Sequence, residues 1–327
     1  GESGLCARMF GVILSSIFEN TEILGEGTAR LRKINLSFLK QLGVKITSKN
    51  NFLPIIINGK LKSGIINIDG SEGSQLLSGL LIALPFLKGD SVINVTNLVS
   101  KPYVDMTISL LKEFGINILN NHYKSFSIKG DQTSKFSTYN VEGDWSGAAF
   151  HLVGAAISGS VSIKGLNVNS LQADMAIIEA LDLCGAIIKW ENNVIFIRKN
   201  NLNAFSFDAT ECPDLFPPIV ALASCCNGRT VISGVKRLKN KESNRAYTLK
   251  KEFAKLGVVI NIEGNKMIIE GGSLILGGNV DSHKDHRIAM ALSVMACVSD
   301  MPISIQNYEA VSKSYSKFYS DLSNVSS

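Results

Sequence analysis

The sequence has few residues of the kinds that bind metal ions or form a disulfide framework. Its 327 residues include six cysteines and four histidines. The cysteines form no Cys-x-x-Cys pair and no zinc spacing, and only His283 and His286 lie close together, without a third ligand nearby. We therefore predict no metal site, and we expect the cysteines, Cys6 among them, to be buried and reduced in a cytosolic protein.

The sequence also lacks the patterns of membrane and nucleic-acid binding proteins. Its apolar runs near residues 76–87 and 288–298 fall far short of the roughly 20 residues that a membrane-spanning helix needs. It has no Lys/Arg-rich run and no interleaving of aromatic and basic residues, and its net charge of +5 is modest. No signal peptide is visible. We expect a cytoplasmic protein that binds neither membrane nor nucleic acid, with a positive charge that serves small anions.

What the sequence does contain is typical of a folded protein with more than one core. Hydrophobic residues make up 45% of the chain and charged residues 19%. At this length two domains are the default expectation. The charge-rich turn at residues 141–144 is the best candidate for the junction, which predicts domains at 1–141 and 142–327.

An internal repeat is the strongest structural signal. A helical pattern ends in a glycine before a short strand at Gly43, Gly115, Gly185 and Gly257, which are 72, 70 and 72 residues apart. Each glycine stands where a left-handed residue closes a helix. A second short strand is predicted after each one, at 54–57, 125–128, 194–197 and 266–269.

Each repeat also has an upstream part, in which an apolar helix is followed by a turn and a strand. These strands are predicted at 89–95, 159–163, 228–233 and 301–305. One repeat therefore consists of a loop, helix, strand, polar loop, helix and two strands, which indicates an α/β fold. Five repeats are visible, and the last stops before its closing strands, so we expect another segment to complete that sheet.

Polar residues recur in two loops of every repeat, and the clearest cluster is Lys241-Glu242-Ser243-Asn244-Arg245. It precedes a helix predicted over 246–256, where the partial positive charge of the helix N-terminus favours phosphate or carboxylate. An acid, two cations and a helix terminus suit an anionic substrate that must also exchange a proton. The alternative is a solvated first turn with a surface ion pair.

Six short motifs follow one another along nearly the whole chain. They are Ser100-Lys101-Pro102-Tyr103 with Asp105, Glu142-Gly143-Asp144, Pro213-Asp214, Lys241-Glu242-Ser243 with Arg245, Asp285-His286-Arg287 with Met290, and Ser312-Lys313-Ser314. In this order and spacing they resemble the enolpyruvyl transferase family, and most closely its 5-enolpyruvylshikimate-3-phosphate (EPSP) synthases.

The resemblance implies a two-domain fold of βαβαββ repeats, an inside-out α/β barrel, with five of six repeats present here. It also implies a transfer that needs no cofactor, in which the enolpyruvyl group of phosphoenolpyruvate moves to the 5-hydroxyl of shikimate 3-phosphate and phosphate leaves through a tetrahedral intermediate. Two small-molecule substrates and a monomeric enzyme of aromatic amino acid biosynthesis are expected.

The resemblance also assigns candidate residues position by position. Those for phosphoenolpyruvate are Gly4, Arg32, Gln75, Arg245, Arg287 and Lys313. Those for shikimate 3-phosphate are Ser74, Gln75, Ser100, Tyr103, Asp214 and Lys241. Asp214, Glu242 and Lys313 are the catalytic candidates: Asp214 would take the proton of the 5-hydroxyl, and Glu242 and Lys313 would serve the enolpyruvyl carbons. The division of acid and base roles among these three stays open.

Five of these residues also have a purely structural alternative. Arg287 could pair with Asp285, Asp214 could cap the helix that follows it, and Tyr103 could pack in the core. Ser74 and Ser100 could cap their helices.

Two features depart from the family pattern. Gly73 stands where the family usually has a serine, which removes one hydroxyl contact to phosphate. The family's first repeat, with its Gly-Ser-Lys-Ser loop, has no counterpart in these 327 residues. We therefore expect a truncated chain whose activity is impaired. The alternatives are a UDP-N-acetylglucosamine enolpyruvyl transferase and a fragment that binds substrate without turnover.

Overall fold

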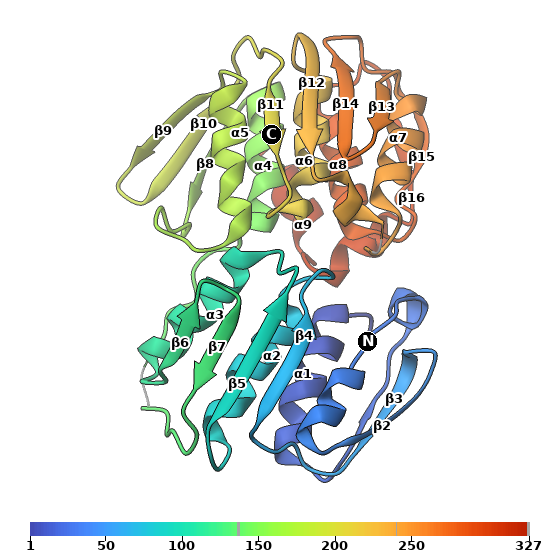
Figure 1. The fold of residues 1–327 in the computed structure, drawn as a ribbon. Coiled ribbons are helices and arrows are strands. Elements are labelled where there is room, and N and C mark those ends of the chain that lie inside the picture. The colour runs from blue at the N-terminus through green and yellow to red at the C-terminus, as the bar shows by residue number, and fades with distance from the viewer. Residues whose placement is uncertain (136–137, 240, 326–327) are drawn as a thin grey trace. The chain divides into compact units, whose positions relative to one another are not determined.

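The computed structural model describes residues 1–135, 138–239 and 241–325. The chain forms two compact units, Gly1–Asn140 and Val141–Ser327, and we describe each by itself (Figure 1). The division lies one residue before the junction expected from the sequence.

Unit 1 combines helices with two β-sheets among its described residues. Its elements are α1 (Gly4–Ile17), β1 (Asn20–Ile23), the 3₁₀ helices η1 (Gly27–Leu31) and η2 (Ser37–Leu42), β2 (Lys45–Lys49), β3 (Phe52–Asn58), β4 (Ile65–Asp69), α2 (Gln75–Ala83), η3 (Leu84–Phe86), β5 (Ser91–Thr96), α3 (Lys101–Glu113), β6 (Ile118–Asn121) and β7 (Ser125–Ile128). The strand orders are β1-β3-β2 and β4-β5-β7-β6.

Unit 2 continues the same alternation. Its elements are α4 (Trp145–Ser158), β8 (Ser160–Lys164), η4 (Ala173–Ala176), α5 (Ile177–Leu183), β9 (Ile187–Glu191), β10 (Val194–Arg198), β11 (Ser206–Asp208), η5 (Pro213–Leu215), α6 (Phe216–Ser224), β12 (Gly228–Ser233), η6 (Val235–Leu238), α7 (Arg245–Lys255), β13 (Val259–Glu263), β14 (Lys266–Gly271), β15 (Gly278–Asp281), α8 (His286–Ala296), β16 (Ile303–Gln306), η7 (Tyr308–Lys313) and α9 (Phe318–Val325). The strand orders are β8-β10-β9, β11-β12-β14-β13 and β15-β16.

The predicted repeat is visible in the topology of both units. In one repeat of each unit, β4-β5-β7-β6 and β11-β12-β14-β13, the sheet places its strands in the order first, second, fourth, third, and the first pair is parallel. The three-stranded sheets β1-β3-β2 and β8-β10-β9 have the same order without the first strand: second, fourth, third. The four spaced glycines are all left-handed, with φ between 80° and 89°. The alternation predicted from glycine spacing is therefore confirmed, and the fold is mixed α/β.

The apolar helices of unit 2 form its core. Helices α4, α6 and α8 contact one another in all three pairs, and every residue of α6 is buried. A helix that is apolar all round is expected to be surrounded in this way. The predicted apolar helices thus lie at the centre of the unit, and their N-terminal ends carry the polar loops.

Helix α1 of unit 1 is surrounded less completely. Its small residues, among them Gly11 and Ser15, are buried, and α1 packs closely on α2. Its other face carries Phe10 and Ile17, which are 50% and 52% exposed. Cys6 belongs to this exposed face, so the expectation that it is buried is wrong. Cys297, at the end of α8, is exposed as well.

Candidate functional site

The charged residues of unit 2 gather where three helices begin. Asp214 lies in η5 directly before α6, Arg245 is the first residue of α7, and Asp285 is the N-cap of α8. Helix N-termini carry unpaired N–H groups and a partial positive charge. The loops of separate repeats therefore bring their polar groups to one place.

Arg245 lies at the centre of this cluster and is 1% exposed. Its Nε donates to Asp285 Oδ2 at 2.8 Å, its Nη1 to Asp214 Oδ1 at 2.6 Å, and its Nη2 to Glu242 Oε2 at 2.5 Å. A solvated surface ion pair, the alternative offered by the sequence, is therefore wrong. Burial disfavours the charged guanidinium, but the three carboxylates outweigh burial and raise the pKa of Arg245 above its usual value.

Asp214 is held by three cations. Lys241 Nζ lies 3.1 Å from its Oδ1, and Arg287 Nη2 lies 3.4 Å from its Oδ2, in addition to the contact with Arg245. Burial alone would raise the pKa of this carboxyl, but Arg287, Lys241 and Arg245 hold it well below its usual range. Asp214 is thus ionised near neutral pH, and its oxygens bind side chains rather than the start of α6, so the capping alternative is wrong.

Arg287 lies between two carboxyl groups. Its Nη1 is 4.0 Å from Asp174 Oδ2, opposite the contact to Asp214. The alternative pairing of its guanidinium with Asp285 is wrong, because Asp285 accepts a hydrogen bond from the backbone N–H of Arg287 and gives its carboxylate to Arg245. Asp174 and Asp285 belong to this cluster but were not assigned roles from the sequence.

The other two catalytic candidates lie at the edge of this cluster. Glu242 is three residues before Arg245 and touches its guanidinium. Lys313 is the last residue of η7 and donates from Nζ to the carbonyl oxygen of Lys284 at 2.9 Å, in the loop before α8. Unit 2 therefore gathers Asp214, Glu242 and the cations at one end of its helices, and Lys313 of η7 contacts the loop before α8.

Unit 1 has a second group of predicted residues around Gly4. A Cβ atom at Gly4 would lie 2.8 Å from Arg32 Nη1 and 2.9 Å from Arg8 Nη1, so a side chain would collide with both guanidinium groups. Arg8 Nη1 also donates to Gln75 Oε1 at 3.2 Å, and Arg32 Nη2 donates to the carbonyl oxygen of Glu2 at 2.7 Å. Gly4, Arg32 and Gln75 are thus brought together, and Arg8, to which the sequence assigned no role, joins them.

The serines of unit 1 stand at the starts of two helices but do not cap them. Ser74 precedes α2 and Ser100 precedes α3, and neither side chain makes a capping hydrogen bond. The capping alternative is therefore wrong for both. The backbone of Ser100 is left-handed, with φ 59°, a conformation that is uncommon for residues other than glycine. Tyr103 is half-buried in the first turn of α3.

The two neighbouring histidines are engaged separately. His283 Nε2 lies 2.9 Å from Glu252 Oε1. His286 is buried, and burial together with Arg287 and Arg245 lowers its pKa to about 4. Within residues 1–135, 138–239 and 241–325, no group of three or more His, Cys, Asp or Glu is placed to hold a metal ion.

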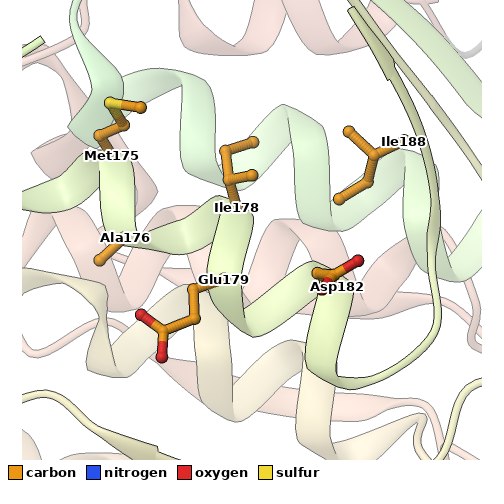
Figure 2. Close-up of a pocket in the computed structure, with 6 residues that line it drawn as sticks. All are labelled: Met175, Ala176, Ile178, Glu179, Asp182 and Ile188. Carbon is orange, nitrogen blue, oxygen red and sulfur yellow. The ribbon is translucent and has the colours of Figure 1, made fainter. Parts of the chain in front are cut away.

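A shallow hollow of about 610 Å³ is lined by residues of η4, α5 and β9 (Figure 2). Met175, Ala176, Ile178 and Ile188 give it apolar walls, and Glu179 and Asp182 are its ionisable residues. It contains no predicted site residue, and two acidic groups do not suit an anionic substrate.

The membrane expectation can be compared with the described helices. None of them is both long enough and apolar enough to cross a membrane.

Comparisons with known proteins give one consistent result. A model of the EPSP synthase family (3-phosphoshikimate 1-carboxyvinyltransferase) matches residues 1–322. The chain is similar to a 3-phosphoshikimate 1-carboxyvinyltransferase from Clostridium botulinum, with 42% identity over 98% of this chain and 75% of the relative. A protein of the same description from Clostridioides difficile is 42% identical over 98% of this chain and 74% of the relative.

Solved structures agree with these sequence matches. An EPSP synthase structure from Acinetobacter baumannii superimposes with a TM-score of 0.81 and 27% identity. The superposition covers all of this chain and 78% of that one.

Proposed function

Because this chain belongs to the EPSP synthase family, we propose that it transfers the enolpyruvyl group of phosphoenolpyruvate to the 5-hydroxyl of shikimate 3-phosphate. The oxygen of that hydroxyl would bond to C2 of phosphoenolpyruvate while C3 gains a proton, which gives a tetrahedral intermediate. Loss of phosphate and of a proton from C3 would then restore the double bond.

The observation that carries this proposal is the position of Asp214 among Lys241, Arg245 and Arg287 at the helix N-termini of unit 2. Two anionic substrates need fixed cations, and guanidinium binds carboxylate and phosphate in a bidentate manner. A preorganised cationic site also stabilises charge that moves onto departing phosphate. The same cluster contains carboxylates that can exchange protons.

The low pKa of Asp214 bears on its proposed role. A carboxylate surrounded by three cations is a weak base, and positioned bases work best when their pKa is close to the working pH. Anionic substrates that draw Lys241 and Arg287 toward themselves would weaken these contacts and raise the basicity of Asp214. We infer that substrate binding activates Asp214 to accept the proton of the 5-hydroxyl.

The remaining roles follow the same logic unit by unit. We propose Arg245, Arg287 and Lys313 in unit 2, and Gly4, Arg32 and Gln75 in unit 1, as contacts to phosphoenolpyruvate. Ser74, Gln75, Ser100 and Tyr103 of unit 1, and Asp214 and Lys241 of unit 2, would contact shikimate 3-phosphate. Glu242 and Lys313 would serve the enolpyruvyl carbons. The transfer needs neither metal nor cofactor in this scheme.

The carboxylates around Arg245 occupy most of its hydrogen-bonding capacity in this structure. Four of its five N–H groups donate to Asp285, Asp214 and Glu242. A bidentate contact to substrate therefore requires at least one of these carboxylates to move away from the guanidinium.

A second candidate function is binding without turnover. The apolar face of α1 supports it. In unit 2 the apolar helices α4, α6 and α8 pack against one another, whereas in unit 1 Phe10 and Ile17 of α1 stay half exposed. A polypeptide segment that covers this face would bury Phe10 and Ile17 and supply further side chains. The chain matches about three quarters of the length of its Clostridium botulinum relative, and that relative's remaining part is the natural segment to add in trans.

The test is phosphate release from phosphoenolpyruvate by this chain, with and without shikimate 3-phosphate. Release that requires shikimate 3-phosphate and disappears in Arg287→Gln would support the transferase. Arg229→Gln is the matched control, because Arg229 forms an exposed ion pair with Glu270. Release that requires a UDP-sugar instead would identify the sister activity.

If this chain releases no phosphate, substrate-binding measurements distinguish binding without turnover from the absence of any such function. Binding of shikimate 3-phosphate without turnover, with turnover restored by the remaining segment of the relative, would identify a binding-competent part. Absence of binding to either substrate would overturn the proposed function.

A further inference from the structure

Asp174 is a buried carboxyl group to which the proposed reaction gives no role. It lies in η4, its side chain is 1% exposed, and Ser146 in the first turn of α4 donates a hydrogen bond to its Oδ2. Its Oδ1 is inaccessible and has no hydrogen-bond partner among the residues that the structure describes. Buried polar atoms are normally satisfied, so this oxygen requires an explanation.

The groups that face Asp174 come from several elements. Arg287 approaches from α8, Asp214 from η5 and Lys241 from the loop before α7, while Ser146 closes the side toward α4. The thiol of Cys212, just before η5, is neutral, because burial and nearby carboxylates that include Asp174 raise its pKa above its usual range. Burial raises the pKa of Asp174, Arg287 lowers it and Asp214 raises it, with a net value of about 6.

The guanidinium of Arg287 links Asp174 to the proposed anion site. Its distances to Asp174 Oδ2 and Asp214 Oδ2, 4.0 Å and 3.4 Å, exceed the usual 2.7–3.2 Å of an N–H···O hydrogen bond. Arg245, in contrast, holds its carboxylates at 2.5–3.2 Å. An anion on Arg287 would add negative charge beside Asp174 and favour its neutral form.

We propose that Asp174 is a positioning residue that takes up one proton from solvent when an anion binds to Arg287. The carboxylate becomes a neutral acid, so the anion replaces its negative charge beside the guanidinium instead of adding to it. Anion binding at Arg287 therefore strengthens as the pH falls through neutrality. This inference rests on the proposed function only in taking Arg287 as an anion-binding residue.

The test measures protons taken up per bound anion by calorimetry at about pH 7, in two buffers with different heats of ionisation. The probes are sulfate, which does not titrate in this range, and phosphoenolpyruvate. We expect the wild-type chain to take up between about 0.3 and 1 proton per sulfate. Asp174→Asn, which cannot gain a proton, should take up none.

Two further variants keep the test decisive. Asp182→Asn replaces an exposed carboxylate on the helix that follows η4, and it should behave as the wild type does. Ser146→Ala removes the hydroxyl donor that lowers the pKa of Asp174, so uptake should reach its maximum at a higher pH. This second shift tests the inference even if Asp174→Asn fails to fold.

Each outcome decides one question. Equal uptake in Asp174→Asn and the wild type, or sulfate binding by the wild type without uptake, overturns the inference and leaves the proposed function standing. Failure to bind phosphoenolpyruvate overturns the proposed function, while sulfate still decides the inference. Failure to bind either anion overturns both.

Discussion

Arg245 binds Asp285 in a bidentate manner, with Nε 2.8 Å from Oδ2 and Nη2 3.2 Å from Oδ1, and both side chains are buried. This pair joins the first residue of α7 to the N-cap of α8. It therefore fixes the distance between two of the helix N-termini at the candidate site. The third guanidinium nitrogen, Nη1, donates to Asp214 before α6.

The first prediction concerns this ion pair. Asp285→Asn keeps a side chain that can cap α8 but removes one of the three carboxylate charges around Arg245, the one that is itself fully buried. Asp214 and Glu242 still compensate the guanidinium in part, so we expect a loss of about 1.5–3 kcal/mol in the free energy of unfolding, measured by urea denaturation. Asp90→Asn is the control, because Asp90 pairs with Lys129 in solvent, and it should leave stability unchanged. A loss no larger than that of the control would show that Arg245 is sufficiently held by its other carboxylates.

The second prediction concerns the space above Gly4. A Cβ atom in Gly4→Ala would press on the ends of Arg32 and Arg8, which are flexible and can turn away. Stability should therefore change by less than about 1 kcal/mol, whereas a displaced guanidinium should weaken phosphoenolpyruvate binding about tenfold, or about 1.4 kcal/mol. Calorimetric titration measures the affinity.

Gly154→Ala serves as the matched control for this change. Gly154 lies in α4, and the nearest atoms to an added Cβ are the methyl groups of Val294 at 4.0 Å, an ordinary contact. Its affinity for phosphoenolpyruvate should equal that of the wild type. Unchanged affinity in Gly4→Ala would remove Arg32 from the list of phosphoenolpyruvate contacts.

The repeat and the site differ in how far sequence could predict them. Gly43, Gly115, Gly185 and Gly257 each close a helix through a backbone conformation that L-residues avoid, so their spacing marks the repeat directly. The polar loops before the helices inherit their positions from it. Local backbone chemistry was therefore sufficient for the α/β alternation.

The sequence could not predict which charged and polar side chains contact one another. Asp174 and Ser146 are 28 positions apart, and only packing brings them together. The same limit explains the exposed Cys6: its apolar neighbours indicate a buried helix face, but which side is covered depends on what packs there. Burial of a particular polar atom is a property of the assembled unit.

The third prediction concerns His286. Burial, Arg287 and Arg245 lower its pKa to about 4, below the value of 6.5 for an unperturbed imidazole. The unfolded chain therefore binds more protons between these values, and stability is lost as the pH falls from about 6.5 through 4. Relative to His286→Gln, the wild type should lose about 2 kcal/mol of unfolding free energy between about pH 7 and 4.5. The imidazole resonances of His286 in NMR spectra should not titrate above about pH 5.

The fourth prediction concerns Asp174, which changes stability with pH in the opposite direction to His286. Its pKa is about 6 in the folded chain and 3.8 without perturbation, so the folded state binds more protons between these values. Stability then falls as the pH rises through this range. Relative to Asp174→Asn, the wild type should lose about 2 kcal/mol of unfolding free energy between about pH 4.5 and 7.5.

The two linkages offset one another in the wild-type chain, because lowering the pH stabilises the fold through Asp174 and destabilises it through His286. The summed effect of these two residues on stability between about pH 4.5 and 7 is therefore small. Each single variant should show the pH dependence of unfolding free energy that the other residue causes. The double variant, with Asp174→Asn and His286→Gln, should restore the wild-type pH dependence even where its stability differs by a constant amount. Parallel slopes in the two single variants would contradict both pKa shifts, because a shift of either residue alone would make the two slopes differ.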